Sequence, residues 1–126
     1  MKVVDSSGWL EYLANGPNAE FFAEPLADPA GLVVPVVSVY EVFKRMLVQL
    51  GETAALEAVA LMQQGLVVEL DAPTALAAAK LSVDHGLPMA DAMILAATVV
   101  HDATLWTQDQ HFERIEGVRY VRKGGE

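Results

Sequence analysis

A length of 126 residues, 53% hydrophobic and 20% charged, is typical of one globular domain with a real core and excludes a disordered chain. The net charge of −9 disfavours passive nucleic-acid binding, but it is compatible with a nuclease that gathers carboxylates around metal ions. The absence of cysteine excludes disulfides and thiolate metal sites and agrees with the cytoplasmic location that we expect. We expect one domain over residues 1–126 and no membrane-spanning segment, because the longest apolar run, near Ala92–Val100, is too short to cross a bilayer.

The first part of the chain alternates between short β-rich runs and amphipathic runs. A strand is expected at Lys2–Val4, and Ser6 and Ser7 are expected to cap the helix that follows. A short helix is then expected at Glu20–Leu26 and a second strand at Leu32–Val37.

A possible capping box marks the third helix. Ser38 and Glu41 have the spacing in which each side chain bonds to the other's backbone N–H, so a helix is expected from there to about Leu50. The remaining expected elements are a helix at Glu52–Gln64, a strand at Leu66–Leu70, a helix at Thr74–His85, a helix from Pro88 to about His101, a strand at Thr104–Thr107 and a short strand at Val118–Val121.

Strands that alternate with helices predict an α/β fold, with a parallel sheet of four to five short strands covered by helices on both faces. Four acids fall at one edge of such a sheet. Asp5 and Asp109 follow strands, Glu41 lies in the first turn of a helix that follows a strand, and Asp91 joins them if its helix enters at the same edge.

Each of these acids also has an ordinary structural interpretation. Glu41 can complete the capping box or pair with Lys44 and Arg45, Asp91 suits a helix N-terminus, and Asp5 and Asp109 are common turn residues. The combination is more informative, because four carboxylates on one edge repel each other unless cations or protons intervene. A cluster of oxygen ligands without histidine or cysteine selects Mg²⁺ or Mn²⁺, which promote phosphodiester hydrolysis by polarising the phosphate and lowering the pKa of a bound water.

Four segments resemble the PIN-domain family, and their order and spacing are closest to VapC-type toxins of toxin–antitoxin pairs. They are Val3-Val4-Asp5-Ser6-Ser7, Ser38-Val39-Tyr40-Glu41-Val42, the run from Leu87 to Thr98 that contains Asp91, and the block from Leu105 to Phe112 that contains Thr107 and Asp109. The resemblance covers essentially the whole chain. It implies a three-layer α/β/α fold, Mg²⁺- or Mn²⁺-dependent cleavage of RNA by an endoribonuclease, a homodimer and inhibition by a small cognate antitoxin.

The resemblance also implies a role for each acid. Asp5 and Asp91 correspond to direct metal ligands, and Asp109 to a ligand that binds the metal directly or through water. Glu41 corresponds to the residue that orients a metal-bound water, and Thr107 to one that hydrogen-bonds within the cluster. Many relatives carry a further acid near position 111, where this chain has His111; we favour an exposed loop histidine over a contact with substrate.

Two other functions remain open. A non-catalytic PIN module would only bind a partner. A phosphoacceptor signalling domain would use Asp71 as the acceptor, but it requires paired acids after the first strand and a lysine near Thr107, which are absent. The negative charge left after metal binding leaves room for a basic partner, or for oligomerisation that builds a local positive rim. We expect a core to contain most of the aromatic residues of the first half, and any that stay exposed to form a partner groove: Trp9, Tyr12, Phe21, Phe22 and Phe43.

Overall fold

Five short strands form the centre of the molecule in the computed structural model, which describes residues 1–124. They are β1 (Lys2–Val4), β2 (Val33–Pro35), β3 (Leu66–Val68), β4 (Thr104–Thr107) and β5 (Arg119–Tyr120). One ladder has the order β1-β4-β5 and the other pairs β2 with β3, and every pairing is parallel. A single parallel bridge between Lys2 and Leu32 joins the two ladders, so the strand order across the centre is β3-β2-β1-β4-β5.

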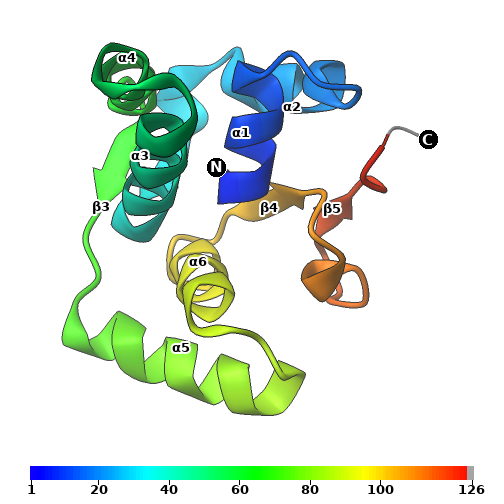
Figure 1. Ribbon diagram of the computed structural model, residues 1–126. Coiled ribbons are helices and arrows are strands. Elements are labelled where there is room, and N and C mark those ends of the chain that lie inside the picture. The colour runs from blue at the N-terminus through cyan, green and yellow to red at the C-terminus, as the bar shows by residue number, and fades with distance from the viewer. Residues whose placement is uncertain (125–126) are drawn as a thin grey trace.

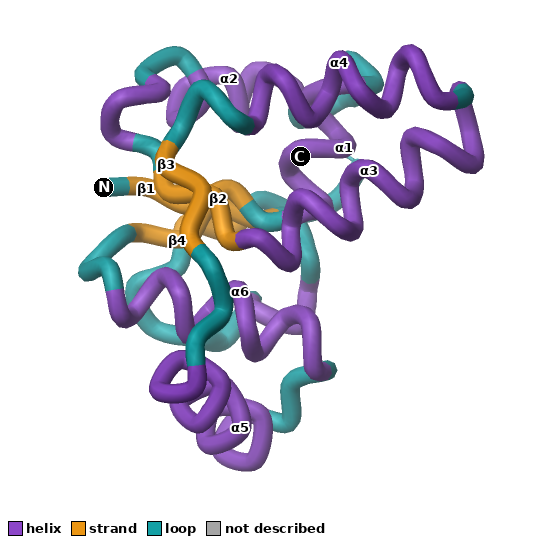
Figure 2. Tube along the Cα trace, turned by 90° about the vertical axis from the view of Figure 1, so that its left-hand side faces the viewer, coloured by secondary structure: helices purple, strands orange, loops and turns teal. Residues whose placement is uncertain are grey.

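Six helices cover the two faces of these strands (Figure 1). They are α1 (Ser6–Leu13), α2 (Ala19–Leu26), α3 (Val36–Leu50), α4 (Glu52–Met62), α5 (Ala72–His85) and α6 (Met89–Val100). Figure 2 shows the strands between a layer that contains α2 and α4 and a layer formed by α5 and α6. The expected three-layer α/β/α arrangement is therefore confirmed.

The two faces of the strands bury separate hydrophobic clusters. Val4, Val34 and Trp106 pack with α1 to α4, whereas their chain neighbours Val3, Val33 and Leu105 pack with α5 and α6. This division follows from the period of two in a strand, which sends successive side chains to opposite faces. Because these strands are buried on both faces, their sequences are runs of apolar residues rather than an alternation of apolar and polar residues.

Two of the expected helix caps are wrong. Ser6 and Ser7 lie inside α1, and the N-cap is Asp5, whose carboxylate accepts a hydrogen bond from the backbone N–H of Gly8. The helix α3 begins at Val36 rather than Ser38, because Pro35 ends the strand and its fixed φ of −62° leads directly into the helix. Ser38 consequently forms no capping box; its hydroxyl is buried without a hydrogen-bond partner within residues 1–124.

The other expected elements are present with shifted ends. The second strand is shorter than expected, since Val36 and Val37 belong to α3, and the third strand ends at Val68. Helix α5 begins two residues early because Asp71, rather than a later residue, caps it by accepting from the Thr74 backbone N–H. Among the described residues no single helix has the length and apolar character to cross a membrane; only α5 and α6 taken together, bent by 116°, reach that length and composition.

Candidate functional site

Asp5 is held at the end of β1 by three hydrogen-bond donors. Its carboxylate accepts from the hydroxyl of Thr107 at 2.6 Å, from the hydroxyl of Ser7 at 2.8 Å and from the backbone N–H of Gly8 at 2.9 Å. A side chain at position 8 would clash with Phe22, since an added Cβ would lie 2.6 Å from its ring. Glycine there lets α1 pack directly against Phe22 and Val4, with Asp5 as its N-cap.

The surroundings of Asp5 oppose its ionisation. The side chain is 2% exposed, and this burial raises the pKa of Asp5 to about 7 even though the hydrogen bonds from Thr107, Gly8 and Ser7 act in the opposite direction. The negative charge of Asp109 adds to the increase. A carboxylate in this position gains from a nearby cation, which would restore its ionised form at neutral pH.

Glu41 is oriented by α1, the helix that Asp5 caps. Its carboxylate accepts from the Ser6 hydroxyl at 2.6 Å. Because α3 starts early, Glu41 lies in the second turn of that helix and is therefore free of the capping role expected for it. The same hydrogen bond links α1 to α3, two helices that are separated by 35 positions in the sequence at this contact.

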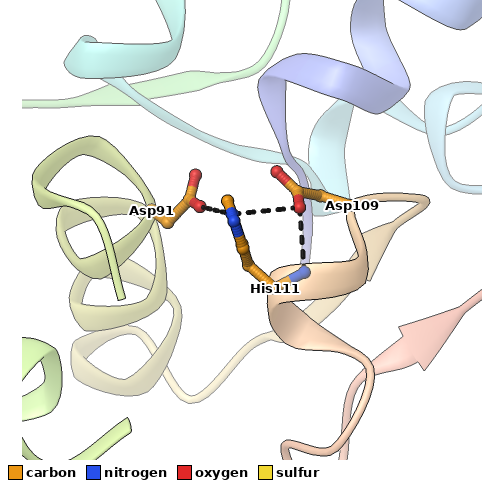
Figure 3. A group of neighbouring side chains, drawn as sticks. All are labelled: Asp91, Asp109 and His111. Carbon is orange, nitrogen blue, oxygen red and sulfur yellow. Dashed lines mark hydrogen bonds and ion pairs between the residues drawn. The ribbon is translucent and has the colours of Figure 1, made fainter. Parts of the chain in front are cut away.

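Asp91, Asp109 and His111 converge from two segments (Figure 3). Asp91 lies in the first turn of α6, and the two others follow β4. The Nδ1 atom of His111 lies 2.8 Å from Asp91 Oδ2 and 3.2 Å from Asp109 Oδ1. One ligand atom from each of the three residues lies within 4.8 Å of the others, so these side chains could hold a metal ion.

The charges in this group are coupled. Burial raises the pKa of Asp91, although its hydrogen bond with His111 acts against this, and the negative charges of Asp109 and Glu41 raise it further. The hydrogen bond to Asp91 in turn raises the pKa of His111. Asp109 is fixed by its own neighbours, since its backbone N–H donates to the Thr107 hydroxyl and its carboxylate accepts from the His111 backbone N–H.

One cleft of about 540 Å³ joins these groups. Asp5, Glu41, Asp91 and Asp109 all line it. Thr107 is fully buried behind Asp5, where its hydroxyl connects Asp5 with the backbone of Asp109. Four carboxylates from four separate segments thus face one cleft, an arrangement that needs cations or protons and that offers the oxygen ligands favoured by Mg²⁺ and Mn²⁺.

A family model described as PIN domain matches residues 2–118. The chain belongs to the PIN-domain family. The resemblance noted in the sequence is thereby confirmed, and a phosphoacceptor signalling domain loses its support. Asp71, the acceptor which that alternative required, caps α5 and is absent from the residues that line the acidic cleft.

Solved structures of PIN proteins share this fold at low sequence identity. A toxin–antitoxin complex from Klebsiella pneumoniae is similar over 100% of both chains, with 19% identity and a TM-score of 0.80. VapC20 from Mycobacterium tuberculosis, described as a sarcin–ricin-loop-cleaving toxin, is similar over 97% of this chain and 99% of its own, with 19% identity and a TM-score of 0.80. DNA-bound VapBC from Salmonella typhimurium is similar over 97% and 98%, with 17% identity and a TM-score of 0.73. No curated protein matches the chain.

The structure brings together the four acids that the sequence placed at one edge, and it adds a residue that the sequence left aside. His111 has a side chain that is 51% exposed, yet its ring contacts two of the acids. The signal that could have found it is the resemblance itself, in which many relatives carry an acid near position 111, in the turn that the Asp109 side chain caps here. The aromatic residues singled out in the first half belong to the core: Trp9 and Phe22 are buried, and Tyr12, Phe21 and Phe43 pack partly buried against them.

Proposed function

We propose that the protein is a Mg²⁺- or Mn²⁺-dependent endoribonuclease that acts as the toxin of a toxin–antitoxin pair. The observation that carries this proposal is the meeting of Asp5, Glu41, Asp91 and Asp109 in one cleft of a PIN domain. Membership of the PIN family supports nuclease activity, and the similarity to VapC20, a toxin that cleaves the sarcin–ricin loop, favours RNA as the substrate.

Asp91 and Asp109 are the ligands that would hold the divalent ion most directly, since their oxygens already converge without any change in fold. Asp5 would complete the set from the end of β1, ionised when the cation offsets its burial. A bound ion of this type supplies a Lewis acid for phosphodiester hydrolysis.

The other residues of the chain prepare the site. Thr107 holds the Asp5 carboxylate and the Asp109 backbone in register through one hydroxyl group. Ser6 fixes the Glu41 carboxylate at the cleft wall, where it can orient and accept a proton from the attacking water. His111 reaches the same group of ligands, and the hydrogen bond to Asp91 raises the pKa of His111, so a proton on its ring would offset the acids when the ion is absent.

A cleavage assay tests this proposal. A structured RNA that carries the sarcin–ricin loop and an unstructured RNA of similar length are incubated with the protein in Mg²⁺, Mn²⁺, Zn²⁺ or EDTA. We expect cleavage with Mg²⁺ or Mn²⁺ and none in EDTA. The absence of cleavage of both RNAs under all conditions, with a folded protein, would favour the alternative of a non-catalytic PIN module that only binds a partner.

The partner that we propose is a small cognate antitoxin, and we also propose that the toxin forms a homodimer. Similarity to the Klebsiella pneumoniae toxin–antitoxin complex supports the first assignment. Tyr40 and Val48 of α3 are 61% and 77% exposed and line the acidic cleft, so an apolar segment of a partner can anchor beside the acids while an arginine reaches them. Co-purification with the product of the adjacent reading frame, with and without its arginines, tests this mode of inhibition.

A further inference from the structure

A second cleft adjoins the acidic one. It has a volume of about 430 Å³ and shares two residues, Ser7 and Asp109, with the first cleft. Its other wall is formed by the C-terminal segment, which contributes Tyr120, Arg122 and Lys123. The two clefts therefore border each other at Ser7 and Asp109, and the second differs from the first in its chemistry.

Basic residues are scarce in this chain but gather at these two clefts. Only eight of the 126 residues are lysine or arginine, against a net charge of −9. Lys44 and Arg45 line the acidic cleft, and Arg122 and Lys123 line the second one, so half of all basic residues border this path. An acidic protein can bind a polyanion when its basic residues are gathered in one place, because phosphate contacts depend on local rather than net charge.

The backbone that carries the second pair of basic residues is fixed. The backbone N–H of Val121 donates to the carbonyl of Thr107 at 3.0 Å, continuing the pairing of β4 with β5. The side-chain amide of Asn18, which is 5% exposed, donates to the carbonyl of Arg122 at 3.0 Å and to Gln108 at 2.9 Å. These buried hydrogen bonds hold the C-terminal segment against the loop that carries Asp109, so the second cleft is already formed.

We propose that the second cleft binds the RNA strand adjacent to the phosphate that is cleaved in the acidic cleft. Arg122 and Lys123 are exposed and would contact its phosphates, and the half-buried ring of Tyr120 would stack on a base. This inference rests on the proposed ribonuclease function. It adds a site that positions the substrate outside the metal-binding residues, and in it Arg122 and Lys123 bind the RNA strand.

Binding can be measured separately from cleavage. The probe is a fluorescein-labelled single-stranded RNA of about 12 nucleotides, and its anisotropy is followed in Mg²⁺ with Asp91→Asn as the background to prevent cleavage. We expect the double substitution Arg122→Gln/Lys123→Gln to raise the Kd about tenfold. The slope of log Kd against log salt should fall by about 1.4, since each phosphate contact on a single strand contributes about 0.7.

A charge-matched control separates a local site from net charge. Lys80→Gln/Arg114→Gln removes the same charge from residues that line neither cleft, and we expect it to change the Kd less than twofold. An equal loss of affinity in both double variants would overturn the proposal, because binding would then follow the charge of the whole molecule.

Stacking by Tyr120 has its own signature. Tyr120→Leu should raise the Kd at least about fivefold without altering the salt slope, and Tyr120→Phe should restore affinity because it keeps the aromatic face. Melting temperatures of both variants identify any loss of folding, and failure of Phe to rescue a folded protein argues against stacking.

If the wild-type protein cleaves RNA while the Arg122/Lys123 variant binds normally, the inference is wrong and the proposed function stands. If RNA binding depends on these residues but no cleavage occurs, the proposed function is wrong, and the second cleft is an RNA-binding site without the role in positioning a cleaved strand.

Discussion

The two walls of the acidic cleft are built in different ways. Asp5 is almost fully buried and accepts hydrogen bonds from three residues, whereas Asp91 and Asp109 are partly exposed and meet each other through His111. The Asp5 wall belongs to the core, since the carboxylate that lines the cleft also caps α1. The positions of Asp91 and Asp109 depend instead on how α6 and the loop after β4 pack against the rest of the molecule.

This difference in burial affects the free energy of unfolding. Burying a carboxylate disfavours its charged form, so an ionised Asp5 destabilises the fold unless a cation lies nearby. The Asp91 wall carries less of that cost and presents its oxygens to solvent, where an ion can enter. Substitutions on the two walls should therefore have similar effects on catalysis but different effects on stability.

The largest expected effect is on cleavage. Asp91→Asn and Asp5→Asn should each lower the rate of RNA cleavage more than about a hundredfold, because each removes charge from a site whose proposed ion would contribute several kcal/mol to catalysis. Both replacements nearly keep the shape of the side chain, so the fold should survive. Single-turnover cleavage in Mg²⁺, with circular dichroism as the check on folding, measures this. Full activity in either folded variant would contradict the assignment of that residue to the site.

The dependence of the free energy of unfolding on pH should distinguish Asp5 from Asp91. The pKa of Asp5 is about 7 in the folded protein and near its ordinary value of 3.8 in the unfolded chain, so the folded state binds the proton more tightly. Stability in EDTA should consequently fall as the pH rises from about 4 to 7, by at most about 4 kcal/mol at 1.4 kcal/mol per pKa unit.

The test is urea denaturation of the wild type and of Asp5→Asn at several pH values in EDTA. The wild type minus variant difference isolates Asp5 from the other acids, and it should become less favourable to the wild type with rising pH and level off above about 7. Asp91→Asn serves as the partly exposed comparison and should change the profile less. A difference that stays flat across this range would show that Asp5 remains ionised in the fold.

A smaller effect is expected at Thr107, which connects the two walls. Thr107→Val keeps the shape but removes the donor to Asp5 and the acceptor of the Asp109 N–H, so unfolding should become easier by about 2 kcal/mol. Thr98→Val is the matched control. Within residues 1–124 the Thr98 hydroxyl bonds only to the Ile94 carbonyl of its own helix, so its loss should cost less than about 1 kcal/mol. Equal losses in urea denaturation would mean that Thr107 holds no special position.

The sequence predicted the elements of the fold better than their ends. Short apolar runs predicted β1 and β4 with the correct residues, because short strands buried on both faces leave little choice of boundary. The start of α3 was wrong because Ser38 and Glu41 match a local capping pattern, whereas the helix begins directly after Pro35 and buries Ser38, Val42 and Met46 along one face. Local patterns compete with packing at helix ends, and packing decided the outcome here.

The positions of some site residues were likewise predictable from the sequence, and those of others were not. The positions of Asp5, Glu41 and Asp109 followed from strand and helix order, which brings them to one edge. The contact of His111 with Asp91 did not follow, since it depends on how α6 docks on the second hydrophobic cluster, a long-range packing event with no signature in local sequence. The gathering of basic residues at the second cleft depends similarly on the hydrogen bond between Asn18 and the Arg122 carbonyl, which spans 104 positions.

The smallest expected effect tests whether His111 occupies a ligand position. His111→Asp would place a third carboxylate beside Asp91 and Asp109, where the ring nitrogen now lies within 3.2 Å of both. The added charge should tighten Mg²⁺ binding about fivefold, which corresponds to about 1 kcal/mol for a partly screened attraction. His85→Asp makes the same charge change at the end of α5, outside the acidic cleft, and should leave the Mg²⁺ affinity unchanged. Affinity is obtained by calorimetric titration or from the dependence of the melting temperature on Mg²⁺ concentration, each referred to the same variant in EDTA. Equal affinities for the two variants would place His111 beside the ligands rather than among them, and weaker binding by His111→Asp than by the wild type would mean that the imidazole is itself a better ligand than a carboxylate.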